Sequence, residues 1–157
     1  KYDLDPDKFT VGMIGNCKKQ KNPMAFAEIA RLVIKEKPQT QFMFGGDGPI
    51  KQDAEDFLKQ YRIDGSVKFT GWTEAPETFM KSIDLFLLTS LWEGMPCTLA
   101  QAAAAKKPII ASDIDGNREF MEAAGAKKYL YSPKNAAEAA AKIIELITIV
   151  KSYKPRP

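Results

Sequence analysis

The residue types that suggest chemistry are concentrated in residues 90–101, which read SLWEGMPCTLAQ. Gly94 lets a ligand lie against the backbone. Pro96 suits the first position of a helix, where its missing N–H leaves no donor unpaired. The first amides of a helix have no acceptor inside it, so they are free to point at a phosphate. The amides concerned belong to Cys97, Thr98 and Leu99. This pattern predicts an anion site at the start of a helix.

Two side chains of the same segment could contact a polyhydroxylated ligand. The carboxylate of Glu93 could accept hydrogen bonds from sugar hydroxyls, and Gln101, about one turn into the helix, could reach a ribose. A structural explanation is equally good, because Glu93 and Thr98 could merely cap the helix. Capping accounts for the residue types but not for the Trp-Glu-Gly-Met-Pro composition of the loop, so both explanations stay open.

Two further loops follow apolar runs of the sequence. Residues 15–22 hold three lysines just before a helix that Pro23 would open, and lysine charge acts on an anion together with free helix amides. Taken alone, this segment is better explained as a solvated charged loop. Residues 45–49 read GGDGP, and their glycines permit close approach of another backbone or of a ligand. Neither loop has the GxGxxG fingerprint, which argues against a nicotinamide dehydrogenase.

Apolar runs alternate with helical patterns along the whole chain, and this alternation must position the three loops. Strict βα alternation with buried strands predicts an α/β fold, a Rossmann-like doubly wound parallel sheet of six strands. In such a sheet, ligands bind beyond the carboxyl ends of the strands, where the strand order reverses. The expected strands are residues 9–14, 41–44, 67–70, 84–88, 108–111 and 128–131. The expected helices are residues 23–35, 50–61, 75–81, 96–107, 117–123 and 135–150.

Length and composition indicate a single globular domain. The chain has 157 residues, of which 45% are hydrophobic and 27% are charged, and this balance is typical of one soluble core. We assign residues 1–150 to the domain and expect residues 151–157, which hold two prolines, to form a flexible tail. The chain begins at Lys1, so we expect it to be a piece of a longer protein.

Charge and rare residues exclude several classes of function. A net charge of +3 does not favour nucleic acid or an anionic membrane as the main partner, and no apolar run reaches the ~20 residues of a membrane span. The absence of histidine removes the commonest acid–base group and metal ligand. Cys17 and Cys97 are isolated and lack CxxC spacing, so they indicate neither a disulfide framework nor a zinc site, and we expect a reducing, cytoplasmic setting.

Five short motifs, taken in order, resemble the C-terminal domain of retaining GT-B glycosyltransferases, glycosyltransferase family 4. Each motif is weak alone, but their order and spacing across residues 9–150 are similar to those of the family. The motifs are GDGP at 46–49, VKFTGW at 67–72, SLWEGMPCTLAQ at 90–101, KPIIASD at 107–113 and GNRE at 116–119. The resemblance implies the C-terminal half of a GT-B fold that binds a nucleotide diphosphate sugar, with metal-independent transfer and retention of anomeric configuration.

The resemblance also implies partners beyond this chain. In the family, an N-terminal domain supplies the acceptor contacts, and we expect that domain to be missing from these 157 residues. The acceptor would be a glycan or a lipid-linked molecule in bacterial polysaccharide biosynthesis. Such an acceptor is compatible with peripheral association of the full-length protein with the inner face of the plasma membrane. The isolated domain would be inactive in transfer.

Individual residues receive roles from the same resemblance. Lys21 matches a lysine that contacts the diphosphate, and Glu93 matches the first glutamate of the E-x7-E motif, which contacts the donor sugar. Backbone groups of Thr98 and Leu99 would bind phosphate. Lys21 and Glu93 are therefore the expected catalytic residues. The expected donor-binding residues are Gly15, Asn16, Lys21, Gly46, Glu93, Gly94, Met95, Pro96, Thr98, Leu99 and Gln101.

Two positions depart from the family pattern. The second glutamate of E-x7-E is Gln101 here, and a neutral amide binds a ribose hydroxyl more weakly than a carboxylate does. The loss would be on the order of 1 kcal/mol of donor affinity. The arginine that often follows the first strand's glycine is Asn16, although Lys18 or Lys19 could compensate for its charge. These departures leave a second hypothesis open, a degenerate nucleotide-sugar-binding or scaffold domain without activity.

Overall fold

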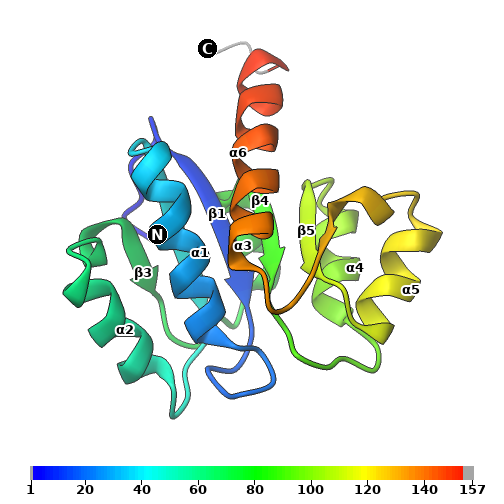
Figure 1. Ribbon diagram of the computed structural model, residues 1–157, viewed down its shortest axis with the longest axis horizontal. Coiled ribbons are helices and arrows are strands. Elements are labelled where there is room, and N and C mark those ends of the chain that lie inside the picture. Colours follow the sequence, from blue (N-terminus) through cyan, green and yellow to red (C-terminus); the bar gives the residue numbers. More distant parts are fainter. Residues whose placement is uncertain (1, 154–157) are drawn as a thin grey trace.

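The computed structural model describes residues 2–153, and it describes side chains for residues 2–150. One parallel six-stranded sheet lies between two layers of helices (Figure 1). The strands are β1 (Phe9–Ile14), β2 (Thr40–Gly45), β3 (Val67–Phe69), β4 (Leu85–Leu88), β5 (Ile109–Ser112) and β6 (Leu130–Tyr131). The helices are α1 (Pro23–Glu36), α2 (Lys51–Gln60), α3 (Pro76–Ser82), α4 (Cys97–Ala104), α5 (Asp115–Ala123) and α6 (Ala136–Tyr153), with short 3-10 turns η1 (Asp64–Ser66) and η2 (Lys127–Tyr129).

The strand order is β3-β2-β1-β4-β5-β6, and every neighbouring pair is parallel. The order reverses between β1 and β4, which pair directly through Val11 opposite Leu85 and Gly12 opposite Phe86. This reversal is the place where open α/β sheets bind ligands. The predicted Rossmann-like fold class is therefore confirmed, and the β1–α1 and β4–α4 loops meet at the reversal.

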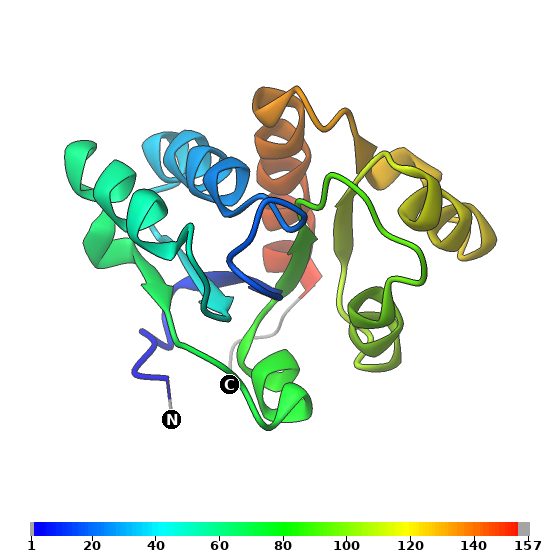
Figure 2. The ribbon, with the colours of Figure 1, turned by 90° about the horizontal axis from the view of Figure 1, so that it is seen from below.

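The core explains why both faces of the sheet are covered. Strand β2 is buried along its whole length, as a parallel strand between two helical layers must be. Helix α1 inserts Phe26 between Phe42 and Phe44 of this strand, with both ring pairs edge to face at centroid distances of 5.7 and 5.1 Å. Helices α1, α2 and α6 lie on one face, and α3 and α4 lie on the other (Figure 2).

Helix α4 and strand β6 are markedly shorter than the sequence pattern predicts. Helix α4 stops at Ala104 because Lys106 adopts a left-handed backbone with φ 58°. The N–H of Lys107 then turns back to the carbonyl of Ala102 at 3.0 Å, an arrangement that ends helices. Residues 128–129, expected in the last strand, belong to the 3-10 turn η2, so β6 keeps only two residues.

The last two helices are longer than the pattern predicts. Helix α5 begins at Asp115, two residues before its expected start. Helix α6 begins as expected, with the Oδ1 atom of Asn135 accepting from the N–H of Glu138 at 3.0 Å. It continues to Tyr153, three residues beyond its expected end and into the segment expected to form a tail, while residues 154–157 lie outside the described part of the chain.

The glycines of the β2–α2 loop serve close packing between two loops. A Cβ atom at Gly46 would overlap the carbonyl oxygen of Gly15 in the β1–α1 loop. The same two loops share hydrogen bonds from Cys17 N–H to the Asp47 carbonyl and from Ile50 N–H to the Cys17 carbonyl, each 2.9 Å. Backbone packing thus accounts for the glycine at position 46 without a ligand, although the sequence pattern had suggested a donor contact there.

This packing predicts that Gly46→Ala destabilises the fold. The new methyl group must displace the Gly15 carbonyl, and we expect a loss of about 1–3 kcal/mol in the free energy of unfolding. Urea denaturation measures the loss. Gly65→Ala is the matched control, because a Cβ atom at Gly65 meets nothing within 4 Å. Equal stabilities of the two variants would contradict the account.

Candidate functional site

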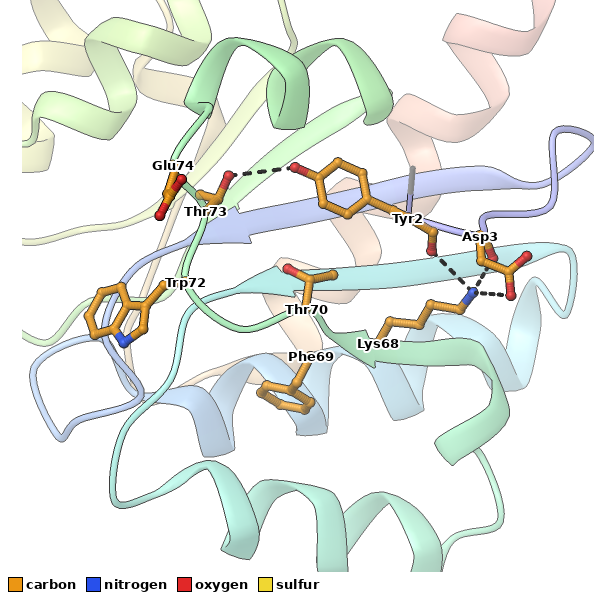
Figure 3. Close-up of a pocket in the computed structure, with 8 residues that line it drawn as sticks. All are labelled: Tyr2, Asp3, Lys68, Phe69, Thr70, Trp72, Thr73 and Glu74. Carbon is orange, nitrogen blue, oxygen red and sulfur yellow. Dashed lines mark hydrogen bonds and ion pairs between the residues drawn. The ribbon is translucent and has the colours of Figure 1, made fainter.

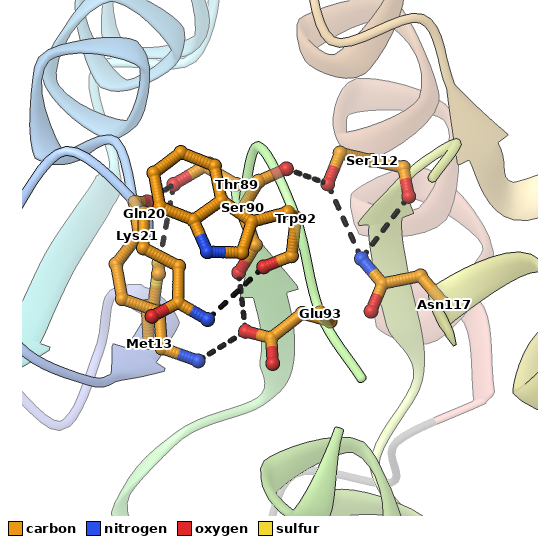
Figure 4. Close-up of polar contacts among 9 residues, drawn as sticks. All are labelled: Met13, Gln20, Lys21, Thr89, Ser90, Trp92, Glu93, Ser112 and Asn117. Atoms are coloured by element: carbon orange, nitrogen blue, oxygen red, sulfur yellow. Dashed lines mark hydrogen bonds and ion pairs between the residues drawn. The ribbon is translucent and has the colours of Figure 1, made fainter. Parts of the chain in front are cut away.

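Hydrogen bonds join the β1–α1 and β4–α4 loops at the reversal of the sheet, and Figure 4 draws those of the Gln20 and Thr89 side chains. The N–H of Leu91 donates to the Gln20 carbonyl at 2.7 Å, and Nε2 of Gln20 donates to the Trp92 carbonyl at 3.1 Å. The hydroxyl of Thr89 donates to the Lys21 carbonyl at 2.6 Å. Two segments about 70 residues apart in sequence therefore form one structural unit.

Lys21 and Glu93 form an ion pair inside this unit. The side chains are only 15% and 7% exposed, so water screens their charges weakly. Ser90 Oγ donates to the same oxygen, Glu93 Oε1, at 2.8 Å. The aliphatic part of Lys21 runs past Gly15, where a Cβ atom would lie 3.0–3.2 Å from the lysine carbons. The structure thus brings together three of the predicted site residues, Gly15, Lys21 and Glu93.

The cap residue of α1, Asn22, comes immediately after Lys21 and directs the lysine toward β4. Asn22 adopts a left-handed backbone with φ 51°, and its Oδ1 accepts from the Ala25 N–H at 3.2 Å. Pro23 occupies the first turn, as predicted. Asn16 is half-buried in the same loop. The asparagine cap turns the chain sharply, so the residue before it faces the neighbouring strand end rather than continuing the helix.

The start of α4 corrects the expectation of three free amides. Pro96 is the cap residue rather than the first helical residue. Its carbonyl already accepts the N–H of Leu99 at 3.0 Å, and the Met95 carbonyl accepts the N–H of Cys97 at 2.9 Å. Of these three amides, only that of Thr98 has no acceptor among the described residues, and the Thr98 hydroxyl is buried without a partner as well. The tight turn at Pro96 consumes the other two donors.

Gln101 lies apart from the ion pair, on the side of α4 that faces α3. It lines a groove of about 570 Å³ with Pro76, Glu77 and Met80 of α3. Its side chain is exposed. No hydrogen bond joins Gln101 to Lys21 or Glu93 in the described part of the chain. The structure does not show contact between Gln101, a predicted donor-binding residue, and the predicted catalytic residues Lys21 and Glu93.

The outer part of the β4–α4 loop is open to solvent. Met95 is 83% exposed and Trp92 is 52% exposed, and a Cβ atom at Gly94 would meet nothing within 4 Å. The loop therefore has a fixed inner part, which carries Glu93, and an accessible outer part that a ligand can approach. Trp72 is also exposed, at 68%, but it lies in a different loop, after β3.

A second cavity of about 670 Å³ lies at β3 (Figure 3). Trp72 and Glu74 stand at one end, and Lys68 is bonded to backbone carbonyls of Tyr2 and Asp3 at the other. The lysine therefore ties down the N-terminal segment instead of facing an open anion site. The sequence reasoning assigned no role to Tyr2 or Lys68, and no pattern in the sequence links them.

The buried cysteine of the β1–α1 loop is chemically quiet. Burial, with a smaller contribution from the nearby charge of Asp47, raises the pKa of the Cys17 thiol to about 11. Cys97, at the first position of α4, is exposed.

No three His, Cys, Asp or Glu side chains gather as a metal-binding group in residues 2–153. No helix in that range is long and apolar enough to cross a membrane.

The sequence did not predict the buried polar residues that link Glu93 to helix α5 through hydrogen bonds. Ser90, Ser112 and Asn117 are buried and hydrogen-bonded to one another (Figure 4). A Cβ atom at Gly116 would overlap the carbonyl of Glu93. The signals in the sequence were three of the short motifs, since Ser90 opens the motif at 90–101, Ser112 lies in KPIIASD at 107–113 and Asn117 lies in GNRE at 116–119.

Known proteins resemble this chain in sequence and in fold. A galactosyltransferase from Escherichia coli, named for transfer from UDP-Gal to α-D-GlcNAc-diphosphoundecaprenol, is 35% identical over 120 residues, which are 73% of this chain and 30% of that protein. The crystal structure of a Staphylococcus aureus TarM variant with fondaparinux, α-GlcNAc-glycerol and UDP has a TM-score of 0.83 at 27% identity. It covers 94% of this chain, which in turn spans 31% of TarM.

A third comparison is with a single domain. The C-terminal domain of a group 1 glycosyltransferase, LpcC from Francisella tularensis, has a TM-score of 0.76 at 25% identity, over 93% of this chain and 78% of that domain. The chain thus spans about a third of its longer relatives and most of this isolated domain. The family model for glycosyl transferases group 1 matches residues 1–154. The chain therefore belongs to the group 1 glycosyl transferases, and its sheet is the Rossmann-like half of a GT-B fold.

Proposed function

We propose that this chain is the donor-binding half of a retaining glycosyltransferase that moves a sugar from a UDP-sugar to a glycan or lipid-linked acceptor. The observation that carries the proposal is the buried Lys21–Glu93 pair at the sheet reversal. The free N–H of Thr98 on the neighbouring β4–α4 segment supports it. The acceptor contacts come from a domain outside this chain.

Lys21 and the start of α4 receive the diphosphate in this proposal. A diphosphate carries more negative charge than the carboxylate that holds Lys21 in the free protein, so it competes for the ammonium group. The Thr98 N–H adds a donor at the positive end of the helix. Both groups then stabilise the charge that develops on the diphosphate as the bond to the sugar breaks. We propose that they make a metal ion unnecessary.

Glu93 orients the donor sugar. Its Oε1 atom is held by Ser90 and Lys21, which leaves Oε2 to accept from a sugar hydroxyl. A fixed sugar exposes its anomeric carbon to the acceptor oxygen in a constant geometry. The carbon–oxygen bond to the diphosphate breaks, the acceptor oxygen bonds to the same carbon, and the acceptor proton passes to the departing diphosphate oxygen. Gly94 and Met95 lie in the open part of the loop, where a sugar would rest.

The relatives support the choice of donor and of acceptor class. The Escherichia coli relative is named for UDP-Gal and a diphosphoundecaprenol-linked acceptor, and the TarM structure contains UDP. The proposal accordingly has the full-length protein act in the cytoplasm, peripherally associated with the inner face of the plasma membrane. There it would meet a lipid-linked acceptor.

A domain that kept the fold and lost transfer is the second candidate. The observation that favours it is the combination of Gln101 in place of a glutamate with a single free amide at the start of α4. Calorimetry separates the two candidates, because an active donor site must bind UDP and UDP-sugars. A scaffold domain would bind neither.

The charge of Lys21 should contribute to the affinity for UDP. Lys21→Met keeps the aliphatic packing against Gly15 but removes the ammonium group, and we expect UDP affinity to fall about tenfold or more, because a hydrogen bond to a charged group is lost. Isothermal titration calorimetry with UDP measures the change. Lys35→Met is the control, since Lys35 is an exposed lysine in the last turn of α1, at the far end of the helix from this loop. Equal effects of both substitutions would refute the role of Lys21.

The two cysteine thiols should differ in their reactivity toward an alkylating reagent. A thiolate is the reactive form, so buried Cys17, with its raised pKa, should not react with an alkylating reagent at pH 8 while the chain is folded. Exposed Cys97 should react, and UDP should slow its alkylation at least about fivefold by covering the start of α4. Mass spectrometry of the intact chain follows both sites, with Cys97→Ala as the control. An unchanged rate at saturating UDP would place the nucleotide elsewhere.

A further inference from the structure

A buried chain of hydrogen bonds runs from the start of α5 to the carboxylate of Glu93 (Figure 4). Asn117 Nδ2 donates to the carbonyl and the hydroxyl of Ser112, at 3.1 and 3.2 Å. The Ser112 hydroxyl donates to the Ser90 carbonyl at 2.6 Å. The Ser90 hydroxyl donates to Glu93 Oε1 at 2.8 Å. The three supporting residues, Ser90, Ser112 and Asn117, are fully buried.

Each link in this chain has only one workable direction. The Ser112 carbonyl can only accept, so the amide nitrogen of Asn117 must face it. A hydroxyl has a single proton, and because Ser112 Oγ accepts from Asn117, that proton is directed to the Ser90 carbonyl. In a buried site such a bond is strong and an unmade one is costly. The position of the Ser90 backbone is therefore set from α5.

Backbone packing acts in the same direction. A Cβ atom at Gly116 would overlap the Glu93 carbonyl and would lie 2.7 Å from the Gly94 carbonyl. The first turn of α5 is thus in direct contact with the segment that carries the carboxylate. Side-chain hydrogen bonds and backbone contact from α5 both restrict where Glu93 can be.

Stability alone does not account for the amide at position 117. Its Oδ1 atom is buried and meets no donor from the described residues, and a buried oxygen without a donor costs stability. An apolar residue of similar size would avoid that cost. The amide instead supplies the donor that orients Ser112.

We infer that Asn117 and Ser112 are positioning residues that hold Glu93 for recognition of the donor sugar, an inference that rests on the proposed function. Neither residue touches the donor. Their effect reaches it through Ser90 and Glu93, so they should influence the sugar and leave the nucleotide unaffected. This difference separates positioning from general support of the fold.

Calorimetry of the chain with UDP, UDP-galactose and UDP-N-acetylglucosamine tests the inference. The quantity compared is the sugar preference, the affinity for the tighter UDP-sugar divided by the affinity for UDP. Ser112→Ala removes both hydroxyl bonds, and Asn117→Asp keeps the shape of the side chain but places an acceptor against the Ser112 carbonyl. We expect each to lower the sugar preference about fivefold or more, with UDP affinity within about twofold of the wild type.

Gln41→Ala is the matched control. Gln41 is a buried amide at the opposite, amino-terminal end of the sheet, where it donates to Thr10 Oγ1 at 2.9 Å and to the Asp5 carbonyl at 2.8 Å. Its loss should lower the melting temperature and leave the sugar preference unchanged. Glu93→Gln should lower the sugar preference at least as much as Ser112→Ala does.

Three results would overturn the inference. They differ in whether they also contradict the role of Glu93 or the proposed function. Wild-type preference in Ser112→Ala and Asn117→Asp, with the preference lost in Glu93→Gln, overturns the inference and leaves the proposed function standing. Equal affinity of the wild-type chain for UDP and both UDP-sugars removes the role of Glu93 as well. A wild-type chain that binds none of the three overturns the proposed function with it.

Discussion

The ion pair between Lys21 and Glu93 is the interaction on which the site depends. Its two partners follow different strands, and they meet only because β1 and β4 are neighbours at the reversal of the sheet. Both side chains are largely buried, so each charge is stabilised mainly by the other. An anionic ligand that draws the ammonium group away leaves the carboxylate to find new donors. Sugar hydroxyls are such donors, which links binding of the two parts of a nucleotide sugar.

The β4–α4 loop is restrained on both sides of this pair. From the β1–α1 loop, the carbonyls of Gln20 and Lys21 accept from Leu91 and Thr89. From α5, Gly116 presses against the Glu93 backbone. The loop is therefore rigid at the carboxylate and open a few atoms further on, a combination that suits precise positioning of a ligand that enters from solvent.

The sequence predicted the architecture well because its signals are local. Buried parallel strands need continuous apolar runs, and the runs around Val11, Phe42 and Leu87 end at loops that the structure brings to one edge of the sheet. The meeting of Lys21 and Glu93 followed from the same topology. That they would pair with each other did not, because the distance between two side chains depends on loop conformation, here on the left-handed cap at Asn22.

Other features depend on contacts that no pattern records. Three amides were expected to be free at the start of α4, yet the turn at Pro96 pairs two of them and leaves Thr98. The spacing of Gln101 does not reveal the rotation of α4, which turns this residue toward α3. Nothing in the sequence marks Asn117 as buried, and only the packing of α5 against the loop shows it.

The central claim is that the Lys21–Glu93 unit and the Thr98 amide together hold a nucleotide diphosphate. Titration of the ¹⁵N-labelled chain with UDP, followed by two-dimensional NMR, tests it at the level of single amides. The account predicts the largest shifts at Thr98 and in the β1–α1 loop beside Lys21. An unmoved Thr98 amide, with shifts confined to the α3–α4 groove around Met80, would contradict it.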